Sequence, residues 1–298
     1  MELSQLRYFQ AVARTQHITR AAAELYVAQP SLSRTVARLE AELGMPLFDR
    51  TGRRIRLNHF GEILLGHVER ALRELDDARL ELSDAAGEER GSVAVAAETL
   101  RALTELVADF RASAPRIELR LYQSSAATMA TQLRAGEVDL ALASQRLAGD
   151  DLEQLELFTE EVLLAVPPDH HLARRRKISV AELVEEPFVT TRSGQWQRTL
   201  LDQLFAGTGR APMIACEGDE PAAIRGLIAA GVGLGLLPTI SRRTTGTPKV
   251  AWVHLDVEIA RRTLRLYWNR ERYLTAATRR FRDFTSAQLR RRRASHPA

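Results

Sequence analysis

The segment VAQPSLSRTVARLEAELGMPLFDR, residues 27–50, decides the fold of the N-terminal part of the chain. Its aliphatic residues from Leu32 to Leu43 recur at helical spacing, and Gly44 is a natural C-terminal stop, so the segment predicts a helix with one buried stripe. Pro30 fits the first turn of this helix, where a missing N–H costs no intrahelical hydrogen bond. The stripe leaves a face of glutamine, serine and arginine free, and that face is either solvated or reads a partner.

Two amphipathic helices are predicted before this segment. Apolar residues from Leu3 to Ala13 recur at helical spacing, and ITRAAAELYV, residues 18–27, forms a second helix after a polar break. The small alanines of the second helix allow helices to cross closely, and Val27 and Ala28 make the turn into the third helix. Three short helices joined by such a tight turn form a helix-turn-helix.

The free face of the third helix carries groups that suit the major groove of DNA. Glutamine can pair with adenine, arginine with guanine, and serine reaches bases or phosphates. For an isolated segment, an ordinary solvated face is the alternative. LFDRTGRRIRL, residues 47–57, favours DNA because it predicts a basic two-stranded wing beside the helix. The candidate DNA contacts are Gln29, Pro30, Ser31, Ser33, Arg34, Arg38, Arg50, Arg53 and Arg54.

Residues 59–90 predict one long helix with a heptad pattern. A long helix that packs only on its own domain is the alternative to a dimer-forming linker. We favour the dimer, because two DNA-binding heads on paired helices match a two-fold symmetric operator. The predicted coiled-coil seam consists of Leu64, Val68, Ala71, Leu75, Ala78 and Leu82.

The charge distribution supports a polyanionic partner for the N-terminal part. Residues 1–58 hold nine arginines against five acidic residues, whereas residues 59–90 hold four arginines against nine acids. A basic head of this kind is suited to nucleic acid. Only two of the 42 basic residues are lysine, and genomic base composition can cause such a skew, so arginine richness alone proves little.

Several protein classes are disfavoured by composition. No apolar run reaches the ~18–20 residues of a membrane span, and the N-terminus lacks a signal-peptide pattern, so we expect a cytoplasmic protein with no membrane partner. Cys216 is the single cysteine; it excludes an intramolecular disulfide and a multi-cysteine metal site, and we expect it to be buried. We also expect no metal site at His170 and His171, because adjacent side chains should point in divergent directions.

From residue 91 onward, short apolar strands alternate with helices. A second set of strands begins at Val162, and a late strand, TLRLYW, followed by a helix over residues 273–289, returns the chain to the first set. This alternation predicts an α/β fold with a mostly parallel sheet and two lobes joined by crossovers. In the first set, the strands are SVAVAA (92–97), IELRLY (117–122) and VDLALAS (138–144), and the helices cover residues 99–112 and 126–135.

These segments resemble the LysR-type transcriptional regulators. LRYFQAVA and ITRAAAELYVAQPSLSRTVARLEAELGMPLFDRTGRRIRL resemble the family's winged helix-turn-helix, except that Ala28 stands where the family usually has serine. LRAGEVDLALAS and GLIAAGVGLGLLP resemble its effector domain, which is similar to periplasmic binding proteins. EGDEPAAIRGLIAAGVGLGLLP is most similar to the branch that includes the glutamate-synthase regulators.

The resemblance implies three parts, and the last of them is a two-lobed effector domain. In order, they are a winged helix-turn-helix DNA-binding domain (1–58), a linker and dimerisation helix (59–90) and an effector-binding domain (91–290). Lobe I covers residues 91–161 and 266–290, and lobe II covers residues 162–265. The basic tail (291–298) lies outside the resemblance, and we expect it to be disordered.

An effector is expected in the cleft between the two lobes. The resemblance places hydroxyls and helix-start N–H groups there, which suit a small anion such as a carboxylate, with arginines as counter-charges. The alternative is that these residues only cap helices or line the surface. The implied residues are Thr99, Leu100, Ser124, Ser125, Thr128, Thr190, Thr191, Arg192 and Gly194. The candidate counter-charges are Arg101, Arg146 and Arg192.

We predict a DNA-binding transcriptional regulator with no cofactor and no enzymatic activity. GxGxxG, GxxxxGK[ST], GxSxG and HExxH are absent from the sequence. The expected protein is a homodimer or dimer of dimers that binds double-stranded DNA at an interrupted inverted repeat and responds to a small-molecule effector. RNA polymerase is a further partner if the protein is an activator. A regulator that ignores small molecules and responds to a partner protein is the open alternative.

Overall fold

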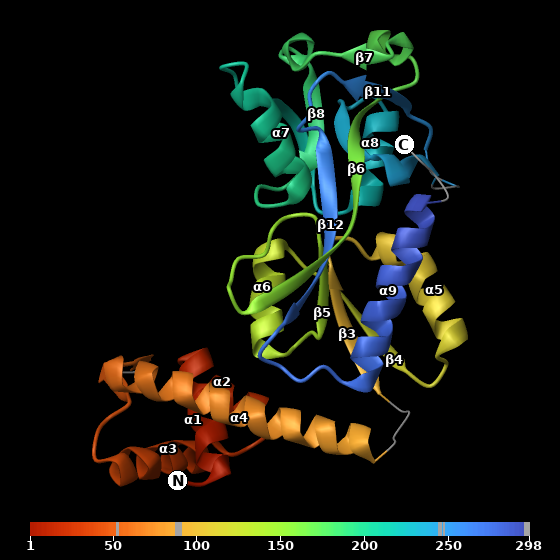
Figure 1. Cartoon of the computed structure of the whole chain (residues 1–298). Coiled ribbons are helices and arrows are strands. Elements are labelled where there is room, and N and C mark those ends of the chain that lie inside the picture. The colour runs from red at the N-terminus through yellow and green to blue at the C-terminus, as the bar shows by residue number, and fades with distance from the viewer. Residues whose placement is uncertain (52–53, 87–90, 244–245, 247, 295–298) are drawn as a thin grey trace. The chain divides into compact units, whose positions relative to one another are not determined.

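The computed structural model describes residues 1–51, 54–86, 91–243, 246 and 248–294. The chain divides into two compact units, Met1–Gly87 and Glu88–Ala298. Figure 1 shows that the first unit is mainly helical, whereas the second has two lobes built around strands. None of the helices within the described residues is long and apolar enough to cross a membrane.

The first unit, called the head below, contains three short helices, a two-stranded hairpin and a long helix. Its core is built from the predicted stripes: Phe9, Leu32 and Leu39 are fully buried, and the Phe9 ring lies 5.5 Å from that of Phe48. Gly44 ends the third helix with a left-handed φ of 70°, which glycine adopts without steric cost. The elements are α1 (Leu3–Thr15), α2 (Ile18–Glu24), α3 (Gln29–Leu43), β1 (Phe48–Thr51), β2 (Arg54–Leu57) and α4 (His59–Ala85).

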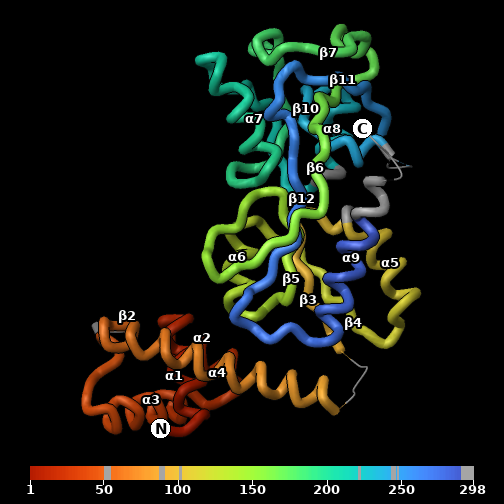
Figure 2. The backbone as a smooth tube through the Cα atoms, viewed as in Figure 1, coloured from red at the N-terminus to blue at the C-terminus, as the bar shows by residue number. Residues whose placement is uncertain are grey.

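The second unit contains the two lobes. Lobe I holds the following elements, where η denotes a 3₁₀ helix: β3 (Ser92–Ala97), η1 (Leu100–Leu103), α5 (Thr104–Ser113), β4 (Glu118–Gln123), α6 (Ala126–Ala135), β5 (Leu140–Ala143) and α9 (Ala276–Ala294). Lobe II holds η2 (His171–Arg174), β7 (Lys177–Ile178), η3 (Val180–Leu183), β8 (Pro187–Thr191), α7 (Trp196–Ala206), β9 (Met213–Gly218), α8 (Pro221–Ala229), β10 (Gly235–Pro238), η4 (Thr239–Arg243) and β11 (Ala251–Leu255). Two long strands, β6 (Leu152–Val166) and β12 (Arg261–Asn269), run side by side through the junction of the lobes (Figure 2).

The sheet is mixed rather than mostly parallel, which corrects the expectation from the sequence. The strand order is β4-β3-β5-β12-β6-β11-β7, and β10 also pairs with β6. The pairs β3–β4, β3–β5, β8–β9 and β7–β11 are parallel, but every pair that involves β6 or β12 is antiparallel. The reason is topological, because β6 carries the chain out of lobe I and β12 brings it back alongside in the opposite direction.

Helices cover both faces of each lobe. In lobe I, the alternating residues of β3 face α5 and α9 on one side and α6 on the other. The rings of Phe110 and Phe281 meet edge to face at 4.9 Å between α5 and α9. In lobe II, α7 packs on one core through Leu201 and Phe205, and α8 packs on another through Ile228. The central strands β3, β5 and β8 are therefore buried on both faces, whereas β4 and β9 leave alternate residues exposed. For the buried strands, the strand ends remain for binding.

The C-terminal helix is longer than expected. A disordered tail was predicted from residue 291, whereas α9 continues to Ala294. The residues 295–298 lie outside the described part of the chain. The helical backbone through the arginine run is consistent with the good helix propensity of arginine.

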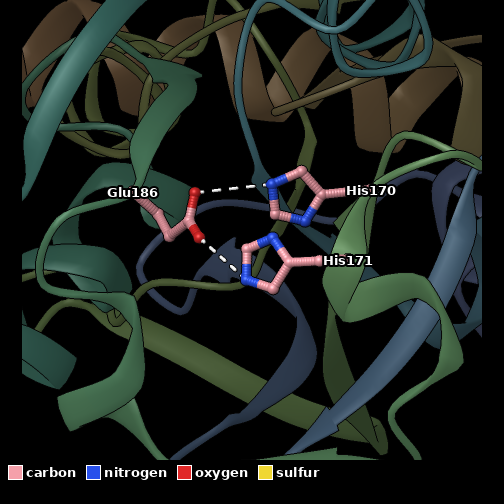
Figure 3. A group of neighbouring side chains, drawn as sticks. All are labelled: His170, His171 and Glu186. Atoms are coloured by element: carbon pink, nitrogen blue, oxygen red, sulfur yellow. Dashed lines mark ion pairs between the residues drawn. The ribbon is translucent and has the colours of Figure 1, made fainter.

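The prediction that the two adjacent histidine side chains point in divergent directions is wrong. The ring centroids of His170 and His171 lie 4.4 Å apart with an interplanar angle of 35°. Both rings direct Nε2 toward the carboxylate of Glu186 (Figure 3). His170 precedes η2 with extended backbone (φ −66°, ψ 144°), and His171 begins that 3₁₀ turn, so the change of backbone direction brings the two rings to the same side.

Candidate DNA-binding face and effector site

The predicted DNA-reading residues of α3 lie on its open face. The head core takes Leu32, Val36 and Leu39 from the opposite face. Arg34 has no acidic partner among the described residues, whereas Arg38 forms an ion pair of 3.5 Å between its Nε and Oε1 of Glu42. Along this face, Gln29, Pro30, Ser31, Arg34 and Arg38 are exposed and Ser33 is half-buried.

The start of α3 is not capped by a side chain. Ala28 is the N-cap residue and makes no side-chain hydrogen bond, as the sequence predicted from its missing hydroxyl. The Ala28 carbonyl instead accepts the backbone N–H groups of Ser31 and Leu32 at 3.0 and 3.2 Å. The positive end of the helix dipole is therefore left for an external anion such as a phosphate.

Tyr26 is a surface residue that the sequence reasoning missed. It lies in the turn between α2 and α3, with a left-handed φ of 54° and 96% of its surface exposed. A tyrosine held in this strained conformation directs a hydroxyl to the surface beside the start of α3. Tyrosine hydroxyls donate to DNA phosphates in many complexes. The sequence placed Tyr26 in a helix over residues 18–27, whereas α2 ends at Glu24 and leaves Tyr26 in the turn.

The wing is present as a hairpin. In it, β1 and β2 are antiparallel, with Phe48 opposite Leu57 and Arg50 opposite Ile55. Buried Phe48 and Ile55 attach the hairpin to the head core. Among the predicted wing contacts, Arg53 and the side chains of Arg50 and Arg54 lie outside the described residues.

The predicted seam on α4 is divided between two surroundings. Val68 is buried in the head core and Leu64 packs partly against it, so these two residues contact their own domain rather than a second helix. The remaining seam residues, Ala71, Leu75, Ala78 and Leu82, are exposed. Leu82 is 71% exposed and Leu75 is 46% exposed, which leaves an uncovered apolar stripe on the C-terminal half of the helix.

In lobe I, the predicted effector residues follow neighbouring parallel strands. The Ser124 N–H donates to the Ala97 carbonyl at 3.1 Å, so the carboxyl ends of β3 and β4 lie together. Ser125 is the N-cap of α6 and accepts the Thr128 N–H at 3.3 Å, and the two hydroxyls lie 2.9 Å apart. Thr99 and Leu100 are half-buried, Arg146 is exposed, and the side chain of Arg101 lies outside the described residues.

In lobe II, the predicted residues lie at the carboxyl end of β8. Thr190 and Thr191 are 4% and 2% exposed, and the Thr191 hydroxyl oxygen has no hydrogen-bond partner within the described residues. Gly194 has a left-handed φ of 87° in the exposed loop that leads to α7. A buried hydroxyl without a partner is costly, so its presence here needs an explanation.

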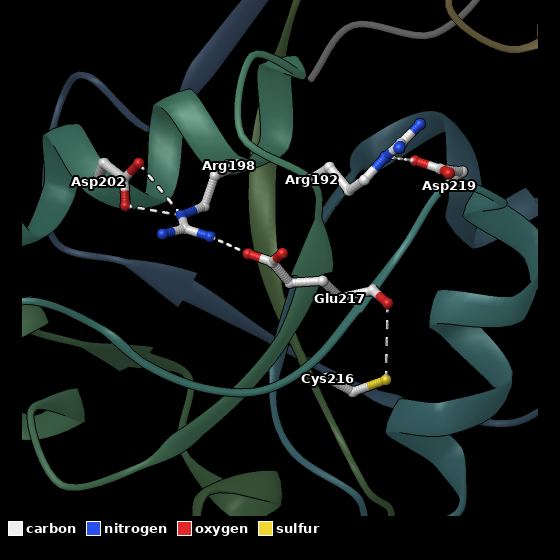
Figure 4. A network of polar contacts seen from close by, with 6 residues as sticks. All are labelled: Arg192, Arg198, Asp202, Cys216, Glu217 and Asp219. Atoms are coloured by element: carbon white, nitrogen blue, oxygen red, sulfur yellow. Dashed lines mark hydrogen bonds and ion pairs between the residues drawn. The ribbon is translucent and has the colours of Figure 1, made fainter.

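Arg192 is not a free counter-charge. It forms an ion pair with Asp219 across the ends of β8 and β9, while Arg198 contacts both Asp202 and Glu217 (Figure 4). An anionic effector would therefore compete with Asp219 for the Arg192 guanidinium. Cys216, expected to be buried, is half-buried on β9, and its Sγ lies 3.9 Å from the Glu217 carbonyl.

Direct contacts between the lobes come from residues that the sequence did not single out. The Gln145 side chain after β5 donates to the Thr199 hydroxyl of α7 at 3.0 Å. Arg262 of β12 lies 4.8 Å from the centre of the Trp196 ring and 3.5 Å from the Ser144 hydroxyl. These contacts hold the start of α7 against the end of β5.

Glu98 and Glu160 add two acidic groups at this junction. Burial raises the pKa of Glu98, although hydrogen bonds from Ser144 and the charge of Arg262 oppose the shift. Glu160 is 10% exposed and forms a 2.7 Å ion pair with Arg262. A glutamate directly after the apolar strand SVAVAA was a signal for the first of these groups.

Comparisons with known proteins match both units. Residues 3–62 match the model of the bacterial regulatory helix-turn-helix proteins of the lysR family, and residues 86–290 match the LysR substrate binding domain. The chain belongs to the LysR family of transcriptional regulators. This confirms the family inferred from the sequence and the mixed α/β fold with a winged head.

Relatives of this LysR-type regulator match it over almost the full length. The chain is 33% identical to the uncharacterized HTH-type transcriptional regulator YybE of Bacillus subtilis over 95% of this chain and 98% of YybE. It is 32% identical to the transcriptional dual regulator GltC of the same organism over 95% of this chain and 96% of GltC. These relatives are transcriptional regulators rather than enzymes.

Solved structures of LysR regulators have the same fold. A full-length variant of OxyR from Pseudomonas aeruginosa matches with a TM-score of 0.69 at 24% identity, over 97% of this chain and 95% of that chain. Full-length CbnR complexed with its target DNA matches with a TM-score of 0.56 at 25% identity, over 97% of this chain and 100% of that chain. The LysR-type regulator described here is thus a DNA-binding protein with an effector-binding domain.

Proposed function

We propose that this LysR-type regulator binds an interrupted inverted-repeat operator as a homodimer or dimer of dimers, under the control of a small anionic effector. The observation that carries the proposal is the open face of α3, where Arg34 is exposed and has no acidic partner among the described residues. An uncompensated arginine beside an uncapped helix start is suited to base edges and phosphates. The regulator acts in the cytoplasm, with RNA polymerase as a partner if it activates transcription.

DNA reading by α3 can be tested with Arg34→Ala. An operator selected from random duplex DNA by the wild-type protein serves as the specific site, and a scrambled duplex serves as the competitor. Arg34→Ala should weaken specific binding by about 1–3 kcal/mol and relax base choice at one position, measured by fluorescence anisotropy. Arg53→Ala should weaken binding to every sequence and reduce the salt slope by about one.

The matched control is Arg174→Ala, because Arg174 is an exposed arginine of the other unit. It removes the same charge and should leave both affinities unchanged. Equal losses on operator and scrambled DNA for Arg34→Ala would refute its assignment as a base-reading residue. An unchanged operator affinity would remove α3 from the interface.

The oligomer is proposed to form through the exposed half of the α4 stripe. Ala71, Leu75, Ala78 and Leu82 lie on one face at heptad spacing, and none of them is used by the head core. A second α4 helix that covers this stripe removes apolar surface from water, at about 25 cal/mol for each Å². Paired helices of this kind would present two heads to the two halves of the operator.

The effector is proposed to bind at the strand ends that carry Thr191, Ser125 and Thr99. The buried Thr191 hydroxyl needs a hydrogen-bond partner, and a ligand carboxylate or hydroxyl would supply one. Ser125 and the first N–H groups of α6 offer a second set of donors. Arg192 can then exchange Asp219 for the ligand, which couples binding to the Arg192–Asp219 ion pair.

The effector proposal is tested by thermal unfolding of the full chain with a panel of small carboxylates, amino acids and aromatic acids. A ligand at about 100 times its Kd should stabilise the effector-binding unit by about 2.7 kcal/mol. Thr191→Val and Ser125→Ala should abolish the shift, whereas Thr159→Val should not, because Thr159 pairs with Thr263 on β6 and β12. No stabilisation by any member of a broad panel would favour control by a protein partner.

A further inference from the structure

We propose that His170, His171 and Glu186 form a site for a divalent transition-metal ion, best suited to zinc, on lobe II (Figure 3). The site goes beyond the proposed function, since none of the three residues belongs to the DNA-binding face or to the effector residues. Two imidazoles and one carboxylate are a donor set that zinc accepts, with water in the remaining position.

The two imidazole–carboxylate distances are longer than direct hydrogen bonds and close to the separation of two ligands of one metal ion. His170 Nε2 lies 3.4 Å from one oxygen of Glu186, and His171 Nε2 lies 3.5 Å from the other. An N–H···O hydrogen bond is typically about 2.7–3.2 Å long, so both contacts are long. Ligands at about 2.0–2.1 Å from a tetrahedral zinc ion are roughly 3.4 Å apart. One ligand atom from each residue lies within 4.8 Å of the others, so a small movement closes the site.

The backbone holds the three ligands in place. The backbone N–H of His170 donates to the Pro167 carbonyl at 3.1 Å, and the backbone N–H of Glu186 donates to the Leu183 carbonyl at 3.1 Å. Leu172 and Leu183 are 4% and 2% exposed, and both belong to the core of lobe II. The ligands thus project from two anchored turns, which is the preorganisation that metal sites require.

One contact of His170 must open when the metal binds. The Leu172 N–H approaches His170 Nδ1 at 3.3 Å, so Nδ1 acts as the acceptor and Nε2 carries the proton. A neutral imidazole that binds a metal through Nε2 carries its proton on Nδ1 instead. Because the Leu172 contact is already longer than a typical hydrogen bond, little is lost when it opens.

The bound metal would join two separate segments of lobe II. His170 and His171 follow β6, which continues from lobe I, and Glu186 lies directly before β8, whose far end carries Thr190 and Thr191. A metal at this position would therefore fix the start of β8 to the turn after β6. We expect zinc to raise the unfolding temperature of the effector-binding unit.

The test is zinc binding to the full chain after chelator treatment, measured by isothermal titration calorimetry with zinc ion alone. Wild-type protein should bind one equivalent of zinc. His171→Ala and Glu186→Gln should each lower the zinc affinity by at least about tenfold, because even groups that only orient a metal ligand typically change the affinity by that factor. His254→Ala is the matched control, because His254 is also a histidine of lobe II beside a carboxylate, with its Nδ1 2.7 Å from Glu161. This pair contains one imidazole, whereas the proposed site has two. It should leave the affinity unchanged.

Cobalt substitution and folding controls make the result decisive. Cobalt at this site should give visible ligand-field bands without a thiolate charge-transfer band, and a thiolate band would place the metal at Cys216 and overturn the proposal. The His171 side chain is 69% exposed, so His171→Ala should melt like wild type in chelator. Zinc binding that survives both His171→Ala and Glu186→Gln, or that His254→Ala weakens equally, would also overturn it.

Discussion

The buried ion pair at the lobe junction should be far more sensitive to substitution than a matched pair on the same strands. Glu160 lies directly opposite Arg262, and Glu156 lies directly opposite Arg265, on β6 and β12. Glu160 and Arg262 are 10% and 6% exposed, whereas Glu156 is 60% exposed. Replacing each glutamate by glutamine makes the same chemical change in two surroundings.

The expected magnitudes follow from burial. Glu160→Gln leaves the Arg262 charge buried without a counter-charge, and removing one partner of a buried pair costs about 3–5 kcal/mol. The Glu160 carboxylate also accepts a hydrogen bond from the Ile240 N–H at 2.8 Å. A glutamine side chain has one acceptor oxygen and one donor NH2 group, so it cannot replace both carboxylate oxygens, one facing Arg262 and the other facing Ile240. Arg265 is also largely buried, at 11% exposed, but its partner Glu156 is 60% exposed and already solvated. Water and the glutamine amide can therefore replace much of the lost contact, and Glu156→Gln should cost clearly less, about 0–1 kcal/mol.

Urea denaturation followed by tryptophan fluorescence measures this difference within the intact chain. The three tryptophans are Trp196, Trp252 and Trp268, and all of them lie in the effector-binding unit, so the signal reports that unit alone. Adding Arg262→Met to Glu160→Gln should recover part of the loss, because the unpaired charge is then gone. If Glu160→Gln and Glu156→Gln reduce the free energy of unfolding by amounts within about 1 kcal/mol of each other, the reasoning from burial is wrong.

Two further predictions concern Glu98 and the α4 stripe. Burial raises the pKa of Glu98 in the folded state, so the contribution of Glu98 to stability is greatest below the ordinary pKa of glutamic acid and is lost as pH rises from there through the raised value. Glutamine does not ionise, so Glu98→Gln should remove this loss. In urea denaturation, the free energy of unfolding of Glu98→Gln relative to wild type should therefore increase from about pH 4 to pH 7. A difference between the two proteins that stays constant over this range would contradict the assignment. Leu82→Glu should dissociate the oligomer in sedimentation velocity, whereas Leu80→Glu, on another side of α4, should not; an unchanged oligomer with Leu82→Glu would exclude the stripe.

Local sequence patterns were sufficient for the helices of the head and for central elements of lobe I. The apolar stripe of α3 and its glycine stop predicted the third helix, because spacing and capping act within a few residues. SVAVAA and residues 126–135 coincide with β3 and α6. These elements are strongly apolar or clearly capped, so each of them is decided by its own residues.

The tertiary structure decided what depends on partners far away in the chain. The first ten residues of β6, LEQLELFTEE, are too polar to predict a buried strand. Three of their four glutamates, Glu156, Glu160 and Glu161, lie opposite arginines of β12, which favours the strand. The Glu160–Arg262 contact spans 102 residues, and the approach of Glu186 to two adjacent histidines depends on how two turns pack on one core. The sequence by itself determined the third helix and the alternation of strands and helices, because these follow from short-range spacing, and its resemblance to known segments gave the family. Only the folded chain decided which charges are buried, which half of the α4 stripe is open and which side chains meet, because those depend on long-range packing.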